Sequence, residues 1–232
     1  ITSQMFKDYL VQQHGVEEQK IEYLPQYAAA QFDDVKPSKT EKETIDLMFA
    51  GNIGAAQSLN TVLKAAELLR DETRLRWHIV GDGSELENLK KIATEKNLDN
   101  VIFYGRKPPE EMPKYYERAD AMLVTLTADR FISLTLPGKV QTYMAAGKPI
   151  IGAAVGEIPN VIAAAQCGYC SAAEDAEGLA QAVLDFIANR NRVQLGKNAR
   201  AYYEQHFTRE MFINNLEQEL KEHALETKGA AV

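Results

Sequence analysis

Short apolar runs alternate with longer amphipathic segments from residue 45 to residue 165. The apolar runs predict strands at 45–50, 74–80, 101–104, 121–125 and 150–153, with a short last strand at 169–171. Helices are expected at 58–69, 85–97, 109–119, 137–146 and 158–165, and three more at 177–189, 191–206 and 208–222. Strands that alternate with helices favour an α/β fold, here a Rossmann-like parallel sheet sandwiched by helices.

The chain before residue 45 follows a different pattern. Residues 3–14 predict a helix with Ser3 as its cap and Gly15 at its end, and residues 21–25 predict a short strand. Polar residues from Gln31 to Glu43 indicate a linker. We therefore expect three parts: residues 1–38 with the linker, a main domain at 39–222 and a flexible tail at 223–232.

Several unusual loops fall where the predicted strands end. They are Gly51–Gln57, Gly81–Ser84, Gly105–Pro109 and Thr125–Gly138. In open parallel sheets, ligands bind beyond the carboxyl ends of the strands. These loops are therefore expected to converge on one crevice that holds a ligand.

The segment from Leu136 to Ile150 carries the clearest chemistry in the chain. Pro137 suits the first turn of a helix, and Gly138 allows close approach of the backbone to a ligand. The free N–H groups of a helix start beside Lys139 form a natural anion site. With Gly147 ending the helix before Lys148 and Pro149, the segment predicts a phosphate or diphosphate at a strand–helix junction.

Composition narrows the class of function. The chain has 232 residues, 45% of them hydrophobic, and a net charge of −7, which argues against nucleic-acid binding. No apolar run is long enough to span a bilayer, and no signal peptide is seen, so a cytoplasmic location is expected. Cys167 and Cys170 are interpreted as buried structural residues, with a redox pair as the alternative. No metal ligand set and no cofactor are expected.

Five motifs in order carry a family resemblance over about residues 40 to 215. They are Phe49-Ala50-Gly51-Asn52-Ile53-Gly54, His78-Ile79-Val80-Gly81-Asp82-Gly83, Val101-Ile102-Phe103-Tyr104-Gly105-Arg106, Ala119-Asp120 and the segment around Lys139. This order resembles the C-terminal, donor-binding domain of retaining glycosyltransferases with the GT-B fold, of the group 1 (family 4) type. The resemblance implies transfer of a sugar from a UDP- or GDP-sugar to an acceptor, in cell-surface polysaccharide biosynthesis.

The resemblance also implies partners. Residues 1–38 would be the remnant of an N-terminal, acceptor-binding domain together with the linker, and that missing domain would complete the enzyme. The final helix would pack against it, and the complete enzyme would associate peripherally with a membrane. The nucleotide sugar is a substrate, so the resemblance implies no separate cofactor. Catalytic residues are not assigned.

Three turns are candidate contacts of the donor. Gly51, Asn52 and Gly54 resemble the family's first glycine loop, which faces the diphosphate, although Asn52 and either Gln57 or Ser58 stand where many members carry cations. Gly81, Asp82 and Gly83 would lie near the nucleotide. Arg106 would reach the base or a phosphate. The alternatives are plain turns, a cap of helix 85–97 by Asp82 or Ser84 with Glu87, and a solvated arginine.

The helix-start segment departs from the family pattern. Many relatives carry two glutamates where this chain has Leu134 and Thr142. Pro137, Gly138 and Lys139 resemble a branch that supplies a cation here instead, and Thr142 would hydrogen-bond a ribose hydroxyl. The loss of both carboxylates keeps two other functions open. They are a non-catalytic nucleotide-binding or interaction module of the same fold, and a sugar-nucleotide epimerase.

Overall fold

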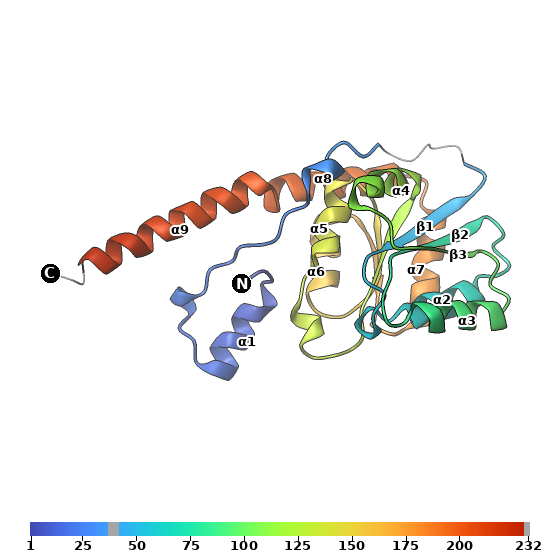
Figure 1. The fold of residues 1–232 in the computed structure, drawn as a ribbon, viewed down its shortest axis with the longest axis horizontal. Helices are drawn as coiled ribbons and strands as arrows, with labels where there is room; N and C mark the ends of the chain where they lie inside the picture. The colour runs from blue at the N-terminus through green and yellow to red at the C-terminus, as the bar shows by residue number, and fades with distance from the viewer. Residues whose placement is uncertain (37–41, 230–232) are drawn as a thin grey trace.

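The computed structural model describes residues 1–36 and 42–229. Its centre is a parallel sheet of six strands in the order β3-β2-β1-β4-β5-β6 (Figure 1). The strands are β1 (Ile45–Ala50), β2 (Leu75–Val80), β3 (Val101–Gly105), β4 (Ala121–Thr125), β5 (Ile150–Ala153) and β6 (Gly168–Ser171). The strand order reverses between β1 and β4, and ligands of such sheets bind at this switch point.

Helices connect these strands and extend both ends of the chain. They are α1 (Met5–His14), α2 (Leu59–Leu68), α3 (Leu86–Glu95), α4 (Met112–Arg118), α5 (Gly138–Ala145), α6 (Glu157–Ala165), α7 (Ala176–Ala188), α8 (Arg192–His206) and α9 (Arg209–Gly229). Figure 1 shows α9 projecting away from the sheet, with α1 and the extended chain after it on the same side. Among the described residues, no helix is long and apolar enough to cross a membrane. The α/β fold expected from the apolar pattern is confirmed.

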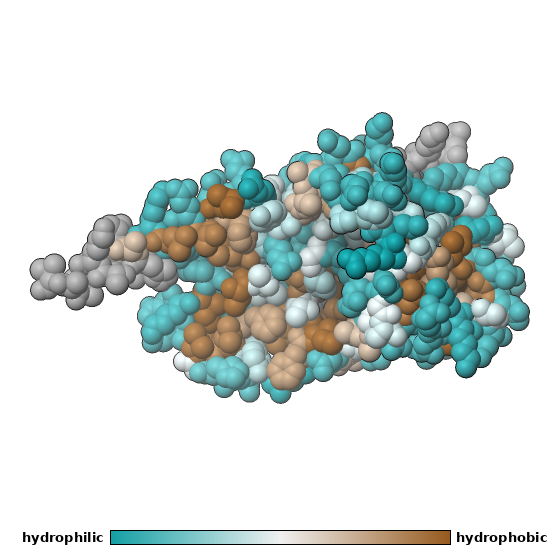
Figure 2. Space-filling view, in the orientation of Figure 1, coloured by the Kyte–Doolittle hydropathy of each residue, from teal (hydrophilic) through white to brown (hydrophobic). Residues whose placement is uncertain are grey.

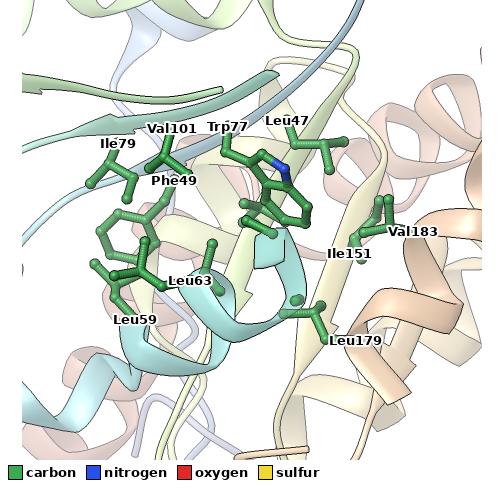
Figure 3. Packing of buried hydrophobic residues seen from close by; sticks show 14 of the residues in the cluster. Leu47, Phe49, Leu59, Leu63, Trp77, Ile79, Val101, Ile151, Leu179 and Val183 are labelled. Carbon is green, nitrogen blue, oxygen red and sulfur yellow. The ribbon is translucent and has the colours of Figure 1, made fainter. Parts of the chain in front are cut away.

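Alternation along β1 divides the apolar core between the two faces of the sheet. Leu47 and Phe49 pack with Trp77 and Ile79 of β2 against α2, α3 and α7 (Figure 3). Met48 points to the other face of the sheet and belongs to a second apolar cluster, which α4, α5, α6 and α8 cover. Because every residue of β1 is buried, this central strand fixes the position of the turn that follows it.

Some expectations for the ends of the chain are wrong. Gly15 ends α1 in a left-handed conformation as expected, but the Ser3 hydroxyl donates to the carbonyl of Leu134 and does not cap the helix. Residues 21–25 form no strand, because no other strand of the described chain pairs with them. The helix at the other end continues to Gly229, beyond the predicted limit of residue 222. The predicted boundary between residues 38 and 39, and residues 230–232 of the predicted tail, lie outside the described residues.

Candidate functional site

Three turns meet at the carboxyl edge of the sheet, as the sequence predicted. The amide of Gly51 donates to the Val80 carbonyl over 2.9 Å, and the amide of Ile53 donates to the Asp82 carbonyl over 2.8 Å. The turn after β2 is joined to the turn after β3 in the same way, since the Gly81 amide donates to the Gly105 carbonyl over 3.0 Å. These backbone bonds hold the turns as one unit.

Close packing of these turns explains why two of their positions, 81 and 83, are occupied by glycine. A Cβ atom on Gly81 would lie 1.8 Å from the carbonyl oxygen of Gly51, and one on Gly83 would lie 2.3 Å from that of Ile53. Both glycines also have a positive φ, of 147° and 158°. Gly81 and Gly83 are therefore required by the packing of backbone on backbone, whatever ligand lies above them.

Helix α5 brings Lys139 to the first of these turns. Pro137 precedes the helix, which begins at Gly138, so the amides of Gly138 and Lys139 come before the first hydrogen bond of the helix, whereas the Val140 amide donates to the Pro137 carbonyl over 2.9 Å. The Lys139 ammonium donates to the side-chain oxygen of Gln57 and lies 3.9 Å from the centre of the Phe49 ring. A Cβ atom on Gly51 would be only 3.2 Å from the same nitrogen. The structure thus brings together Gly51 and Lys139.

The environment of Lys139 disfavours its charge. The side chain keeps partial contact with solvent, yet burial of its ammonium lowers the pKa of Lys139 to about 7. No carboxylate of the described residues forms an ion pair with this ammonium. A bound anion would supply the missing negative charge, so the arrangement is suited to a phosphate.

The other predicted site residues lie around this centre with their side chains engaged locally. The Thr142 hydroxyl donates to the Gly138 carbonyl over 2.9 Å within α5. The exposed Asn52 folds over Gly54, and its amide nitrogen lies 2.9 Å from the place of a Cβ on that glycine. Arg106 is exposed directly after β3. These positions leave their contact with a donor as a proposal.

The predicted side-chain cap of the helix after β2 is wrong. Helix α3 begins at Leu86 without a side-chain cap, and the Asp82 carboxylate instead accepts from the amide of Gly83 over 2.8 Å. A backbone carbonyl binds the start of the helix in place of a side-chain cap: the Glu85 amide donates to the Ile53 carbonyl over 3.0 Å. Asp82 therefore shapes its own turn.

Lys148 of the Gly-Lys-Pro sequence lies away from the anion site. It is 2% exposed, and its ammonium donates to the carbonyls of Ala119, Lys36 and Glu117 over 3.0, 3.3 and 3.4 Å. Glu117 and Ala119 lie at the end of α4, just before β4 and at the amino edge of the sheet, and Lys36 belongs to the segment before β1. A cavity of about 600 Å³ lined by Lys148 and Asp120, among others, lies at this edge too.

Gly147 does end α5 with a φ of 61°, as predicted.

The sequence did not identify Gln57 and Phe49 as parts of the site. Gln57 was interpreted only as a lost cation, although its place next to the first glycine turn was visible. Phe49 was counted as strand core, which it also is, and nothing in its pattern reveals the cation above its ring. The side chain of Gln26, from the segment before the sheet, lies over Gly138.

The two cysteines are structural, as expected. Both are free thiols, Cys167 buried and Cys170 partly buried. Burial raises the pKa of the Cys167 thiol to about 12 and that of Cys170 to about 11. Since the thiolate is the reactive form, neither residue is set up as a redox nucleophile.

Comparisons with known proteins agree with this geometry. The family model for glycosyl transferases group 1 matches residues 31–202. The "Probable glycosyltransferase WbjE" of Pseudomonas aeruginosa is 30% identical over 162 residues, which make up 69% of this chain and 40% of that protein. The amylovoran biosynthesis glycosyltransferase AmsK of Erwinia amylovora is 24% identical over 145 residues, 61% of this chain and 36% of that protein.

A solved structure extends the similarity to the fold. The HepE protein of Anabaena, in complex with UDP, aligns with a TM-score of 0.80 and 15% identity over 95% of this chain and 62% of that chain. The chain spans well under two thirds of the curated relatives that it matches.

Proposed function

Because the chain belongs to the glycosyl transferases group 1 family, we propose that it binds the donor of a glycosyltransferase reaction. The donor is a nucleotide-diphosphate sugar, a UDP- or GDP-sugar, whose sugar passes to an acceptor in cell-surface polysaccharide biosynthesis. The UDP complex of HepE and the process named for AmsK support this class of donor and setting.

One observation carries the proposal. The Lys139 ammonium, the first turn of α5 and the Gly51 turn meet at the switch point of the sheet, and no carboxylate of the described residues neutralises that ammonium. In the proposed reaction, Lys139 and the helix amides stabilise the negative charge that develops on the departing diphosphate. Gly51, Gly54 and the turn of Asp82 lie along the nucleotide, and Thr142 approaches the ribose.

The proposed partner is an N-terminal domain that carries the acceptor. An apolar surface on the described chain supports it. Ile213 and Leu220, seven positions apart on one face of α9, are 40% and 62% exposed. The rings of Tyr27 and Phe212 lie 5.2 Å apart between their centres, with 59° between their planes. Figure 2 shows apolar side chains gathered over this side of the molecule, around α9 and the chain before the sheet.

A second candidate rests on Leu134 and Thr142, which replace the glutamates of many relatives. A module of this fold that binds a nucleotide without catalysing transfer would tolerate their loss. Sugar transfer by the complete protein distinguishes this candidate from the enzyme.

A nucleotide screen tests the donor site. We expect UDP or GDP to raise the melting temperature of the chain more than ADP does, and a metal chelator to leave this shift unchanged, because a ligand that binds only the folded state stabilises it. Calorimetry then gives the affinity. A chain that responds to none of the three nucleotides has no donor site of the proposed kind.

A further inference from the structure

The backbone of Gln57 is held in place independently of Lys139. Gln57 closes the short 3-10 turn η3 (Ala55–Gln57), where its backbone amide donates to the Gly54 carbonyl over 3.0 Å. Its own carbonyl accepts from the hydroxyl of Thr125, at the end of β4. The backbone of Gln57 therefore connects the first glycine turn to the neighbouring strand, and its side chain extends from this fixed backbone to Lys139.

That oxygen is the polar partner of the Lys139 ammonium, and it carries no net charge. The other close neighbours are the Phe49 ring, 3.9 Å away, and the backbone at Gly51. An amide and an aromatic ring orient an ammonium without neutralising it. A carboxylate at the same place would form an ion pair and compete with an incoming anion.

We propose that Gln57 is a positioning residue of the donor site: its neutral side chain holds the ammonium of Lys139 over the first glycine turn and leaves its charge for the diphosphate. The inference rests on the proposed function. It explains how the Gly51 turn, which has no cation of its own, can bind a phosphate with the help of Lys139 from α5.

Ionisation supports this arrangement. Burial alone lowers the pKa of Lys139 to about 7, so the free protein holds this proton weakly. The acidic side chains in the turns after β2 and β4 bond to backbone amides: Asp82 accepts from Gly83, and Asp129 accepts from the amides of Phe131 and Ile132. On α5 itself, burial raises the pKa of the Tyr143 phenol well above its ordinary value, so Tyr143 stays neutral.

A bound diphosphate favours the charged form of Lys139, so binding above neutral pH takes up a proton. Affinity is then expected to fall by up to about tenfold for each pH unit above about pH 7. The terminal phosphate of UDP, with a second pKa of about 6, is already ionised in this range and adds little to the change.

The test is calorimetry with UDP at about pH 7 and about pH 9 on the wild type and two variants. Gln57→Glu keeps the shape and adds a carboxylate that pairs with Lys139. We expect it to weaken UDP binding at least about tenfold at the lower pH and to flatten the pH dependence.

Gln57→Met keeps the length of the side chain and removes the hydrogen-bond acceptor. It should weaken binding several-fold and retain the fall with pH. Gln194→Glu, exposed on α8, is the matched control for added charge.

The outcomes separate this inference from the proposed function. If the wild type binds none of UDP, GDP and ADP, the donor site itself is wrong and the inference falls with it. If the wild type binds UDP and Lys139→Ala loses that binding, but Gln57→Glu keeps the wild-type affinity and pH dependence, only the role of Gln57 is wrong. Equal loss in both Gln57 variants with an unchanged pH profile would assign Gln57 to the fold of the turn and also overturn the inference. Melting curves confirm that each variant is folded.

Discussion

At the scale of the residue, the Lys139 ammonium has a pKa lowered by burial and donates a hydrogen bond to a neutral amide. Replacing it with alanine should weaken UDP binding by about 1.5–3 kcal/mol, the range for one charge-assisted contact. Calorimetry at neutral pH measures the change. Lys64→Ala, exposed on α2, serves as the control and should bind as the wild type does. Unchanged affinity in a folded Lys139→Ala protein would remove this residue from the site.

The glycines of the crevice separate into two kinds, and substitution by alanine distinguishes them. Gly81→Ala places a Cβ 1.8 Å from the Gly51 carbonyl oxygen and should lower the free energy of unfolding by about 3 kcal/mol or more. Gly105→Ala keeps a left-handed φ of 67° but meets no atom within 4 Å, so the conformational cost alone, about 1–2 kcal/mol, is expected. Urea denaturation of both variants provides the comparison. Equal losses would mean that the contact between the turns is not tight.

At the scale of the element, Lys148 connects the end of α4 to the start of β5. Removing its ammonium in Lys148→Met leaves the carbonyls of Glu117 and Ala119 without this donor. We expect the free energy of unfolding to fall by about 1–3 kcal/mol at neutral pH. Denaturation in urea measures it.

The same variant has a pH signature with a definite sign. Burial, the largest cause, lowers the pKa of Lys148 from 10.5 to about 8. Between these values the unfolded chain holds a proton that the folded chain has released, so the unfolding free energy of the wild type rises with pH. Lys148→Met lacks this contribution. The stability gap between the two proteins should therefore widen from about pH 8 to about pH 10, and a gap that narrows would contradict the buried position of Lys148.

The sequence predicted the elements because their apolar periods are strong. Each of the six strands was located to within one or two residues, since a buried parallel strand is a nearly continuous apolar run. Residues 21–25 also carry apolar side chains, but no strand of the described sheet pairs with them, and pairing is not a local property. The same limit applies to the site. The meeting of Lys139 with the Gly51 turn followed from topology, whereas its bond to Gln57 depends on side-chain directions that no spacing encodes.

At the scale of the whole molecule, the chain spans 40% of its relative WbjE, and a second domain is proposed to complete the enzyme. We expect the isolated chain to bind the nucleotide and to transfer no sugar, because a single half neither positions the acceptor nor excludes water. Incubation with labelled UDP- and GDP-sugars and a lipid-linked acceptor checks this. Addition of the upstream domain should restore transfer. Turnover by this chain alone would show that the two-domain interpretation is wrong.

The strand order also sets when the site forms. By sequence separation, we expect β1 to pair first with β2, its neighbour along the chain, and later with β4, where Leu47 lies opposite Ala121. The Gly51 turn and Gln57 come from the early part of this order, and Thr125 and Lys139 come from the late part. We therefore expect β1, β2 and β3 to assemble before the residues that would hold a phosphate come together. Nucleotide added during refolding should bind only after this long-range contact closes, and so it reports on the slowest step of assembly.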